Sequence, residues 1–230
     1  MHDDESFLNA GACIMKVEIW SDIACPWCYV GKRRFEQALG RFEHRDDVEV
    51  VWRSFELDPD APRSVGMPQD ELLAKKYGMP IERAREMNAR MTSEAAKEGL
   101  DFHVDRVQVG NTFDAHRLVH LAAEAGKAEA MKERLMRAYF TEGESVGDPA
   151  TLERLAAEVG LDVTSVRDVL GGDRFAADVR ADESRARSFG ISGVPFFAID
   201  ERYGVSGAQP PDVLLEALRQ AHTEVPTRDG

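Results

Sequence analysis

The sequence predicts an α/β fold in which strands and helices mix at both ends of the chain and a long helical region separates them. Three observations support this class. A short apolar strand, a helix and a β-branched strand follow one another before residue 56. Stretches with the apolar spacing of helices then fill roughly residues 69–171. A helix, two short strands and a last helix complete the pattern.

The first unit is a strand, a helix and a second strand. Lys16 to Trp20 is rich in apolar residues and predicts a short strand, and Tyr29 to Phe42 has the pattern of a helix. Val48 to Phe55 is β-branched and aromatic, which favours a second strand. Prolines between Leu57 and Pro62 end it, because proline cannot donate to a strand ladder. The connection through a helix predicts parallel strands with a right-handed crossover.

The central region carries several amphipathic helices with start and stop residues. Serine, threonine and aspartate favour helix starts, and glycine favours the position just after a helix. On these signals, Thr112 and Asp148 are expected N-caps. The helices are expected within Gln69 to Gly171, at Pro80 to Gly99, Thr112 to Gly126, Ala128 to Glu142, Asp148 to Gly160 and Asp162 to Leu170.

The last unit is a helix, two strands and a helix. Asp173 is expected to cap a helix that runs to Phe189. Pro195 to Ile199 and Tyr203 to Val205 have the composition of two short strands, and Pro211 to Ala221 has that of a closing helix. Without the central block, this order of elements is that of a thioredoxin fold. We therefore expect an α/β thioredoxin-like fold with a large all-α insertion.

The element order also predicts the domain organisation. Residues 15–62 and 173–222 are expected to form a discontinuous thioredoxin-like domain, and residues 63–172 an inserted helical domain. Residues 1–14 and 223–230 are expected to be disordered tails. Met15, directly before the first strand, is a possible true start. Cys13 would then lie in an extension, and we interpret it as incidental, although an exposed free thiol can form intermolecular disulfides.

Composition and charge exclude several classes of function. The 230 residues are 43% hydrophobic and 31% charged, which is an ordinary globular balance. The net charge of −13 argues against nucleic acid and anionic membranes as main partners. No apolar run approaches the roughly 18 residues of a membrane span. The N-terminus lacks the basic start and apolar core of a signal peptide, so a cytoplasmic location is expected.

Cys25 and Cys28 lie between the first strand and the first helix, with Pro26 and Trp27 between them. Two cysteines with this spacing at such a junction are typical of a redox motif. Unpaired N–H groups and the dipole at a helix start favour the thiolate of Cys25, the form that attacks disulfides. Cys28 lies one helical turn on and can close a disulfide with Cys25. The pattern predicts Cys25 as nucleophile, Cys28 as resolving thiol and Pro26 in the first turn, where its missing N–H costs little.

Two other interpretations of the cysteines stay open. A zinc site usually needs two further ligands, and the only other cysteine is Cys13. Two inert buried thiols are also possible. His116 and His120 share one helix face, but no third ligand accompanies them. We therefore expect no metal, and a hydrogen-bonded role for His120.

Four motifs, in this order along the chain, resemble the FrnE-like branch of the DsbA-family thiol–disulfide oxidoreductases. They are Ser-Asp-x-x-Cys-Pro-Trp-Cys-Tyr-x-Gly from Ser21, Trp-Arg-Ser-Phe-Glu-Leu-x-Pro from Trp52, Asn-Thr-x-x-Ala-His from Asn111 and Ser-Gly-Val-Pro-Phe-Phe from Ser192. The resemblance runs from about Met15 to Ala221. It implies a thioredoxin fold whose helical insertion forms a lid domain over the motif.

The resemblance also implies positions for substrate binding. Thioredoxin-like proteins place a cis-proline beside the cysteine pair, which assigns that role to Pro195. Such a loop leaves the backbone of Val194 free to pair with an extended peptide. Trp27 can cover part of the disulfide and offer an apolar contact to a substrate.

Four polar residues complete the expected site. Asn111, Thr112 and His116 are candidates to line it beside Cys25, and Asp22 is expected to shape the turn before the motif. Many thioredoxin-like proteins carry a buried acid six residues before the first cysteine, where this chain has Ile19. The proton acceptor for Cys28 is therefore unidentified. Glu56 is a weak candidate, expected to be a surface charge at a strand end.

The expected function is that of a thiol–disulfide oxidoreductase or isomerase acting on protein disulfides through a mixed disulfide, without a cofactor. The expected partners are proteins with disulfides or dithiols, with glutathione as a possible redox partner, and the protein would be a monomer or homodimer. One alternative is a glutathione-dependent kappa-type transferase or 2-hydroxychromene-2-carboxylate isomerase-like enzyme. Those relatives typically carry serine where this chain has Cys25. A second alternative is a redox-regulated holdase.

Overall fold

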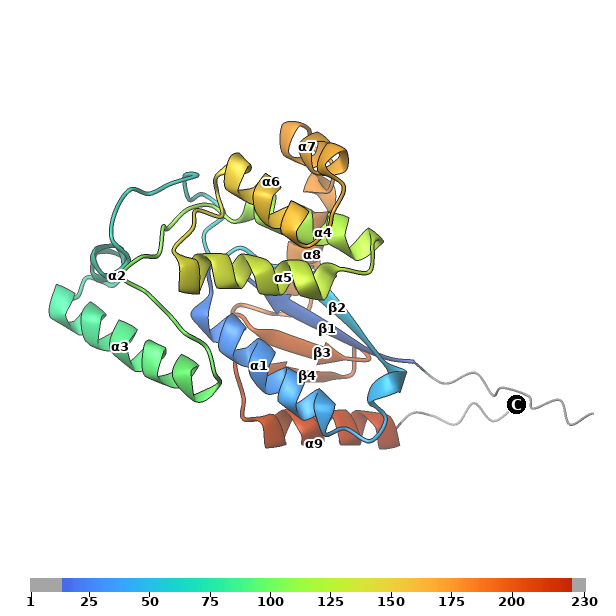
Figure 1. Ribbon diagram of the computed structural model, residues 1–230. Helices are drawn as coiled ribbons and strands as arrows, with labels where there is room; N and C mark the ends of the chain where they lie inside the picture. The colour runs from blue at the N-terminus through green and yellow to red at the C-terminus, as the bar shows by residue number, and fades with distance from the viewer. Residues whose placement is uncertain (1–13, 225–230) are drawn as a thin grey trace, which may run out of the picture.

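The computed structural model describes residues 14–224, and the expectations for Cys13 and for the rest of residues 1–13 and 225–230 lie outside this range. A four-stranded sheet with the order β2-β1-β3-β4 forms the centre (Figure 1). Its strands are β1 (Met15–Ser21), β2 (Val48–Ser54), β3 (Phe196–Ile199) and β4 (Tyr203–Ser206). Strand β1 pairs in parallel with β2 and antiparallel with β3, and β3 and β4 form an antiparallel pair. The expected βαβ unit is confirmed.

Helices cover both faces of this sheet. Helix α1 (Pro26–Gly40) lies in front of the sheet in Figure 1 and α8 (Ala176–Ser188) lies behind it. Helix α9 (Pro211–Thr223) packs beside α1 and contacts β3 and β4. A 3₁₀ turn at Arg45–Asp47 leads from α1 into β2. The α/β thioredoxin-like fold class predicted from the element order is therefore correct.

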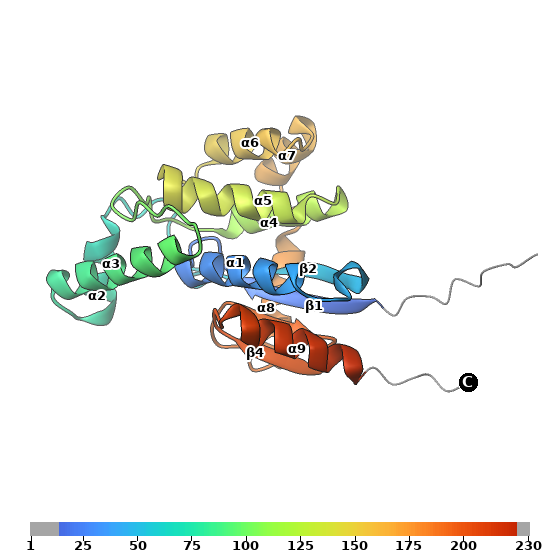
Figure 2. The same cartoon turned by 60° about the horizontal axis from the view of Figure 1, so that its bottom comes forward.

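The segment between β2 and α8 is helical throughout its regular elements, as expected. Figures 1 and 2 both show α4 to α7 stacked beyond the sheet, with α2 and α3 together at one side. The elements are α2 (Gln69–Tyr77), α3 (Ile81–Lys97), α4 (Phe113–Glu124), α5 (Ala128–Arg137) continued by a π turn (Ala138–Glu142), α6 (Pro149–Glu158) and α7 (Val163–Gly171). The division into two domains at residues 62 and 173 stays a proposal. No helix within residues 14–224 has the length and apolar character needed to cross a membrane.

Local capping signals explain some helix starts and not others. Asp148 accepts the N–H of Thr151 and Asp162 accepts that of Ser165, both at 2.8 Å, so these starts are confirmed. The expected cap at Asp173 is wrong, because α8 begins only at Ala176. Phe175, directly before it, has a φ of 63° and is left-handed, which separates Asp173 from the helix. Helix α1 begins at Pro26, which agrees with the first-turn position expected for this proline, although the sequence pattern predicts a helix only from Tyr29.

Strand β1 is buried on both faces. Val17 and Ile19 join the main apolar core, whereas Trp20 packs with Ala186 in a smaller cluster on the other side of the sheet. Glu18 is also buried and accepts hydrogen bonds from arginines on β2 and α8. Because β1 runs through the middle of the molecule, the loop after its last residue starts in the interior. That loop carries the two cysteines.

Candidate active site

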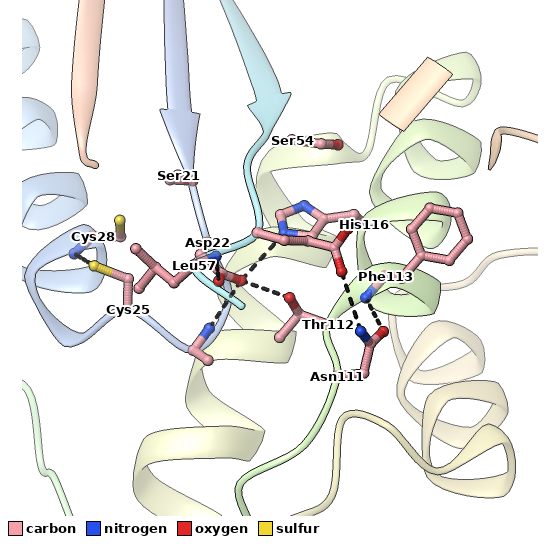
Figure 3. Close-up of polar contacts among 12 residues, drawn as sticks. Ser21, Asp22, Cys25, Cys28, Ser54, Leu57, Asn111, Thr112, Phe113 and His116 are labelled. Atoms are coloured by element: carbon pink, nitrogen blue, oxygen red, sulfur yellow. Dashed lines mark hydrogen bonds and ion pairs between the residues drawn. The ribbon is translucent and has the colours of Figure 1, made fainter. Parts of the chain in front are cut away.

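The two cysteines lie at the start of α1 with different environments (Figure 3). Cys25 has extended backbone angles and is the N-cap residue, and its Sγ accepts the backbone N–H of Cys28 at 3.3 Å. Pro26 follows at the first helical position, as predicted. The exposed fraction is 4% for Cys25 and 1% for Cys28. Both thiols are thus buried, and Cys25 is the slightly more accessible one.

The electrostatics of Cys28 favour its protonated form. Burial is the largest cause and raises the pKa of its thiol well above the usual value, with further increases from the hydrogen bond and charge of Cys25. A thiolate at Cys28 therefore needs help from other groups. Lys132 is among those that act in the opposite direction.

The loop before β3 lies directly beside the cysteines. The peptide bond between Val194 and Pro195 is cis, which confirms the implication of the resemblance. Cys25 Sγ donates to the carbonyl oxygen of Val194 at 3.7 Å. A Cβ atom on Gly31 of α1 would lie 2.8 Å from Pro195 Cγ, so only glycine allows this close approach. Gly31 stands in the first quoted motif, but the sequence alone assigned it no role.

Two large apolar side chains near the motif are exposed. Trp27, between the cysteines, is 44% exposed. Leu57 is 45% exposed and is tied to the motif loop, because its backbone N–H donates to Asp22 Oδ2 at 2.8 Å. An apolar surface of this kind beside a reactive pair can contact the side chains of a polypeptide.

Asp22 connects three segments of the chain (Figure 3). Besides Leu57, its carboxylate accepts the Thr112 hydroxyl at 2.8 Å, contacts His116 Nε2 at 3.3 Å and accepts the Ala24 N–H at 3.4 Å. The last contact is the turn-shaping role expected from the sequence. The others tie the motif loop to the end of β2 and the start of α4, which no local pattern shows.

The surroundings of Asp22 favour its ionised carboxylate, and those of His116 favour its neutral imidazole. Burial raises the pKa of the Asp22 carboxyl, but His116, Leu57 and Thr112 outweigh it and hold this pKa below its usual value. Burial also lowers the pKa of His116, and the nearby charge of Lys132 lowers it further, against the effect of Asp22. A neutral imidazole can still donate one N–H to the carboxylate.

The start of α4 differs from the expectation. Thr112 occupies the N-cap position but makes no capping hydrogen bond, because its hydroxyl is directed to Asp22. Asn111 provides the cap in its place, since its Oδ1 accepts the Phe113 N–H at 2.8 Å. The Nδ2 of Asn111 donates to Glu56 at 3.3 Å. Thr112 and His116 are buried. The structure thus brings Thr112 and His116 to Asp22, three residues before Cys25, and not to the solvent.

Glu56 is not the surface charge expected at a strand end. It is buried, pairs with Arg180 of α8 and accepts the hydrogen bond from Asn111. Burial, with smaller effects of Glu183 and Asp22, raises the pKa of its carboxyl to about 7 in spite of Arg180. The reason for the error is that α8 covers this end of β2, a contact between distant parts of the sequence.

Lys132 of α5 is a further charged group near the motif, and sequence reasoning missed it. Its Nζ donates to the carbonyl oxygen of Ser21 at 3.0 Å and lies 5.7 Å from the centre of the Trp52 ring. Burial lowers the pKa of this lysine to about 8, against the charges of Cys28, Asp22 and others. A signal existed, because Lys132 lies next to Met131 and one turn before Met136, which are both buried.

His120 and the potential metal ligands lie apart from the cysteines. His120 Nε2 is 3.1 Å from Ser54 Oγ and 3.2 Å from Asp182 Oδ2, which confirms a hydrogen-bonded role. Within residues 14–224, His44, Asp47 and His222 form a group of three potential ligands. The rings of the two histidines are stacked with centroids 3.8 Å apart and planes at 11°. Their lone pairs lie in nearly parallel planes and do not converge on one ion.

Comparison with known proteins agrees with this geometry. Residues 16–219 match the model of the DSBA-like thioredoxin domain. The uncharacterized protein YwbO of Bacillus subtilis (strain 168) is 31% identical over 205 residues, which cover 88% of this chain and 94% of YwbO.

Two solved structures are similar over nearly the whole chain. The probable DsbA oxidoreductase SCO1869 from Streptomyces coelicolor is 50% identical with a TM-score of 0.88, over 91% of both chains. The cytosolic disulfide reductase DsbM from Pseudomonas aeruginosa, solved with GSH, is 21% identical with a TM-score of 0.65, over 90% of this chain and 99% of DsbM. The second likeness concerns the fold alone. By its family match, its fold and its cysteine pair, this chain belongs to the DsbA-like thioredoxin domain family of thiol–disulfide oxidoreductases.

Proposed function

We propose that this protein exchanges thiols and disulfides on polypeptide substrates, with Cys25 as nucleophile and Cys28 as resolving thiol. The observation that carries the proposal is the position of Cys25 Sγ. It accepts an N–H at the start of α1, and it lies 3.7 Å from the Val194 carbonyl oxygen. A backbone N–H at the sulfur stabilises a thiolate. The neighbouring backbone of Val194 is of the kind that pairs with an extended peptide.

The reaction proceeds in two exchange steps. The Cys25 thiolate attacks one sulfur of a substrate disulfide, which forms a mixed disulfide and releases the other substrate sulfur as a thiolate. Cys28 then loses its proton and attacks Cys25, which forms the Cys25–Cys28 disulfide and releases the second substrate thiolate. The substrate gains two electrons and the protein loses two. The reverse sequence oxidises a substrate dithiol, and the reduction potential decides the net direction.

The other residues of the site have supporting roles in this proposal. Trp27 and Leu57 contact apolar side chains of the substrate, and the loop of Val194 and Pro195 aligns its backbone. Asp22, with Thr112 and His116, fixes the motif loop. Asn111 caps α4 and thereby holds Thr112 in place.

We assign the chain to the FrnE-like branch and to the cytoplasm as part of the same proposal. The four motifs support the branch, and DsbM, described as a cytosolic reductase, has the same fold. DsbM was solved with GSH, so glutathione is a candidate reductant for the Cys25–Cys28 disulfide. The adjacent pair of thiols favours thiol–disulfide exchange over the conjugation of glutathione by a kappa-type transferase. The reason is that the nucleophile in the proposed reaction is a thiol of the protein and not that of glutathione.

A redox titration against glutathione, with counting of free thiols and an insulin-turbidity assay, tests this function. We expect oxidation to remove both Cys25 and Cys28 from the thiol count and reduction to restore them. Insulin reduction should fall to the uncatalysed background in Cys25→Ser. Full activity in the double variant Cys25→Ser/Cys28→Ser, or glutathione conjugation of a standard electrophile by it, would contradict the proposal.

A further inference from the structure

The protein buries two lysines whose surroundings differ. Lys32 is 2% exposed and has carboxylates of three glutamates within salt-bridge distance, Glu36, Glu129 and Glu133. Lys132 is 1% exposed and, in the part of the chain that the structure describes, pairs with no carboxylate. Its hydrogen-bond acceptor there is the Ser21 carbonyl oxygen, at 3.0 Å. An ammonium carries three N–H donors, and the hydrogen bond to Ser21 uses one of them. The ammonium of Lys132 can therefore interact with a further group.

The position of Ser21 shows where this charge is directed. Ser21 ends β1 and is followed at once by Asp22 and the cysteine loop. Lys132 of α5 therefore contacts the residue directly before the motif loop, in the interior of the protein. The buried Ser21 hydroxyl there has no hydrogen-bond partner among the described residues.

With its ammonium at the Ser21 carbonyl, Lys132 lies close enough to Cys28 for their charges to act on each other. The charges that oppose the burial effect on the pKa of Lys132 are, in order, those of Cys28, Asp22, Cys25 and Glu129. In turn, Lys132 lowers the pKa of Cys28, against burial and against Cys25. On α4, His116 also lies close enough for Lys132 to lower its pKa. Among these groups, the carboxylate of Asp22 already contacts four neighbours. A thiolate at Cys28, in contrast, would be a negative charge that forms only during the reaction.

The need for a cation arises in the second step of the proposed reaction. Once Cys25 is part of a mixed disulfide, it can no longer be a thiolate, so its charge ceases to act on Cys28. Burial still opposes ionisation of Cys28, and the carboxylate of Asp22 is fixed nearby. The backbone N–H of Asp22 and the ammonium of Lys132 both lower the pKa of Cys28, and of these two only Lys132 carries a full positive charge.

We propose that Lys132 is a positioning residue for resolution, whose buried ammonium stabilises the Cys28 thiolate as it attacks the mixed disulfide. This inference rests on the proposed function. Cys28 gives its proton to water, the bond between Cys25 and the substrate sulfur breaks, and the Cys25–Cys28 bond forms. The substrate sulfur leaves as a thiolate and is protonated by solvent. At pH 7, below its pKa of about 8, Lys132 stays protonated during this step, so no further reactant is needed.

Single-turnover kinetics with glutathione disulfide test the role of Lys132. Reduced protein is mixed with this probe, quenched in acid at set times, alkylated and analysed by intact mass. The time course separates formation of the Cys25–glutathione adduct from its resolution by Cys28. The measurement is made from pH 6 to pH 9.5 on the wild type, Lys132→Met and Lys132→Arg, with Lys32→Met as the matched buried control.

We expect Lys132→Met to slow resolution at least tenfold at pH 7 and to move the midpoint of its pH profile upwards. Formation of the adduct should change less than threefold. Lys132→Arg should restore part of the rate, and Lys32→Met should resolve like the wild type. If Lys132→Met does not fold, Lys132→Gln removes the charge and keeps a donor for Ser21, with the same expectation.

Two outcomes distinguish this inference from the proposed function. Resolution within twofold of the wild type at every pH in the charge-free variants, with an unchanged midpoint, would overturn the role of Lys132 alone. A wild type that forms no Cys25–Cys28 disulfide at all would overturn the proposed function itself.

Discussion

Two charged clusters each contain a buried lysine, and they differ in the groups that surround its ammonium. In the Lys32 cluster (Lys32, Glu36, Glu129, Glu133), a lysine is surrounded by carboxylates that are 30–53% exposed. In the Asp22 site (Asp22, Thr112, His116, Lys132), every side chain is buried, and most hydrogen bonds connect a charged group to a neutral one.

The difference shows in the ionisation of the two lysines. Burial lowers the pKa of Lys32, but Glu129, Glu36 and Glu133 outweigh it and raise this pKa above its usual value. The pKa of Lys132 falls to about 8, because burial dominates. Ion pairs fix the charge of the first cluster and join α1 to α5. In the second cluster, no salt bridge within residues 14–224 joins Lys132 to Asp22, so the charge of Lys132 stays sensitive to a nearby thiolate.

The largest expected effect on stability is at Asp22. Asp22→Ala removes the acceptor of the Leu57 N–H, the Thr112 hydroxyl and His116, and leaves buried donors without partners. Such donors cost about 1–3 kcal/mol each, so we expect a loss of roughly 3 kcal/mol or more in the free energy of unfolding. Urea denaturation measures it. The control Asp212→Ala removes an exposed carboxylate and should change the value by less than about 0.5 kcal/mol.

A smaller effect separates the two lysines. Lys32→Met leaves Glu129 without its cation, whereas the other two glutamates keep ion pairs with Arg33. Because these carboxylates are also partly exposed, we expect a loss of only about 1–2 kcal/mol in the free energy of unfolding. Lys132→Met orphans no carboxylate and replaces a buried charge with an apolar chain of similar length, so stability should be unchanged or increased. Urea denaturation of both variants checks this. A larger loss in Lys132→Met than in Lys32→Met would contradict the comparison.

The smallest effect is a pH dependence that belongs to Lys132. Its pKa is about 8 in the folded protein and 10.5 ordinarily, so the unfolded chain binds more protons between these values. Stability therefore rises with pH in this window, by about 1 kcal/mol between pH 8 and pH 9. The Cys28→Ser background removes the titration of that thiol. There, the stability of the chain with Lys132 should rise with pH relative to that of Lys132→Met, so that any advantage of the methionine variant shrinks. A difference that does not change with pH would argue against the lowered pKa.

The sequence predicts those features that depend on near neighbours. The approximate strand ends and the parallel pairing of β1 and β2 follow from periodicity. The cap at Asp148 and the helix start at Asp162 follow from contacts three residues apart. The pair of cysteines at the start of α1 is equally local.

The parts that sequence reasoning missed depend on contacts between distant segments. Thr112 is 90 residues from Asp22, and this contact replaces the local cap that the sequence predicts. Glu56 is buried by α8, and Lys132 reaches Ser21 from 111 residues away. A lysine or glutamate on an amphipathic element is usually solvent-exposed. The neighbouring methionines hint that Lys132 is buried, but only the packing of the helices shows what Lys132 and Glu56 contact.

The division of labour between Cys25 and Cys28 is tested most directly by trapping mixed disulfides. Cys28→Ser and Cys25→Ser are each incubated with an oxidised protein substrate, alkylated and compared by non-reducing gels and intact mass, before and after reduction. We predict that Cys28→Ser accumulates adducts bound through Cys25 and that Cys25→Ser traps none, while both variants remain folded. Equal trapping by the two variants would contradict the assignment of the nucleophile. Trapping by neither, with activity retained, would remove the cysteines from the mechanism.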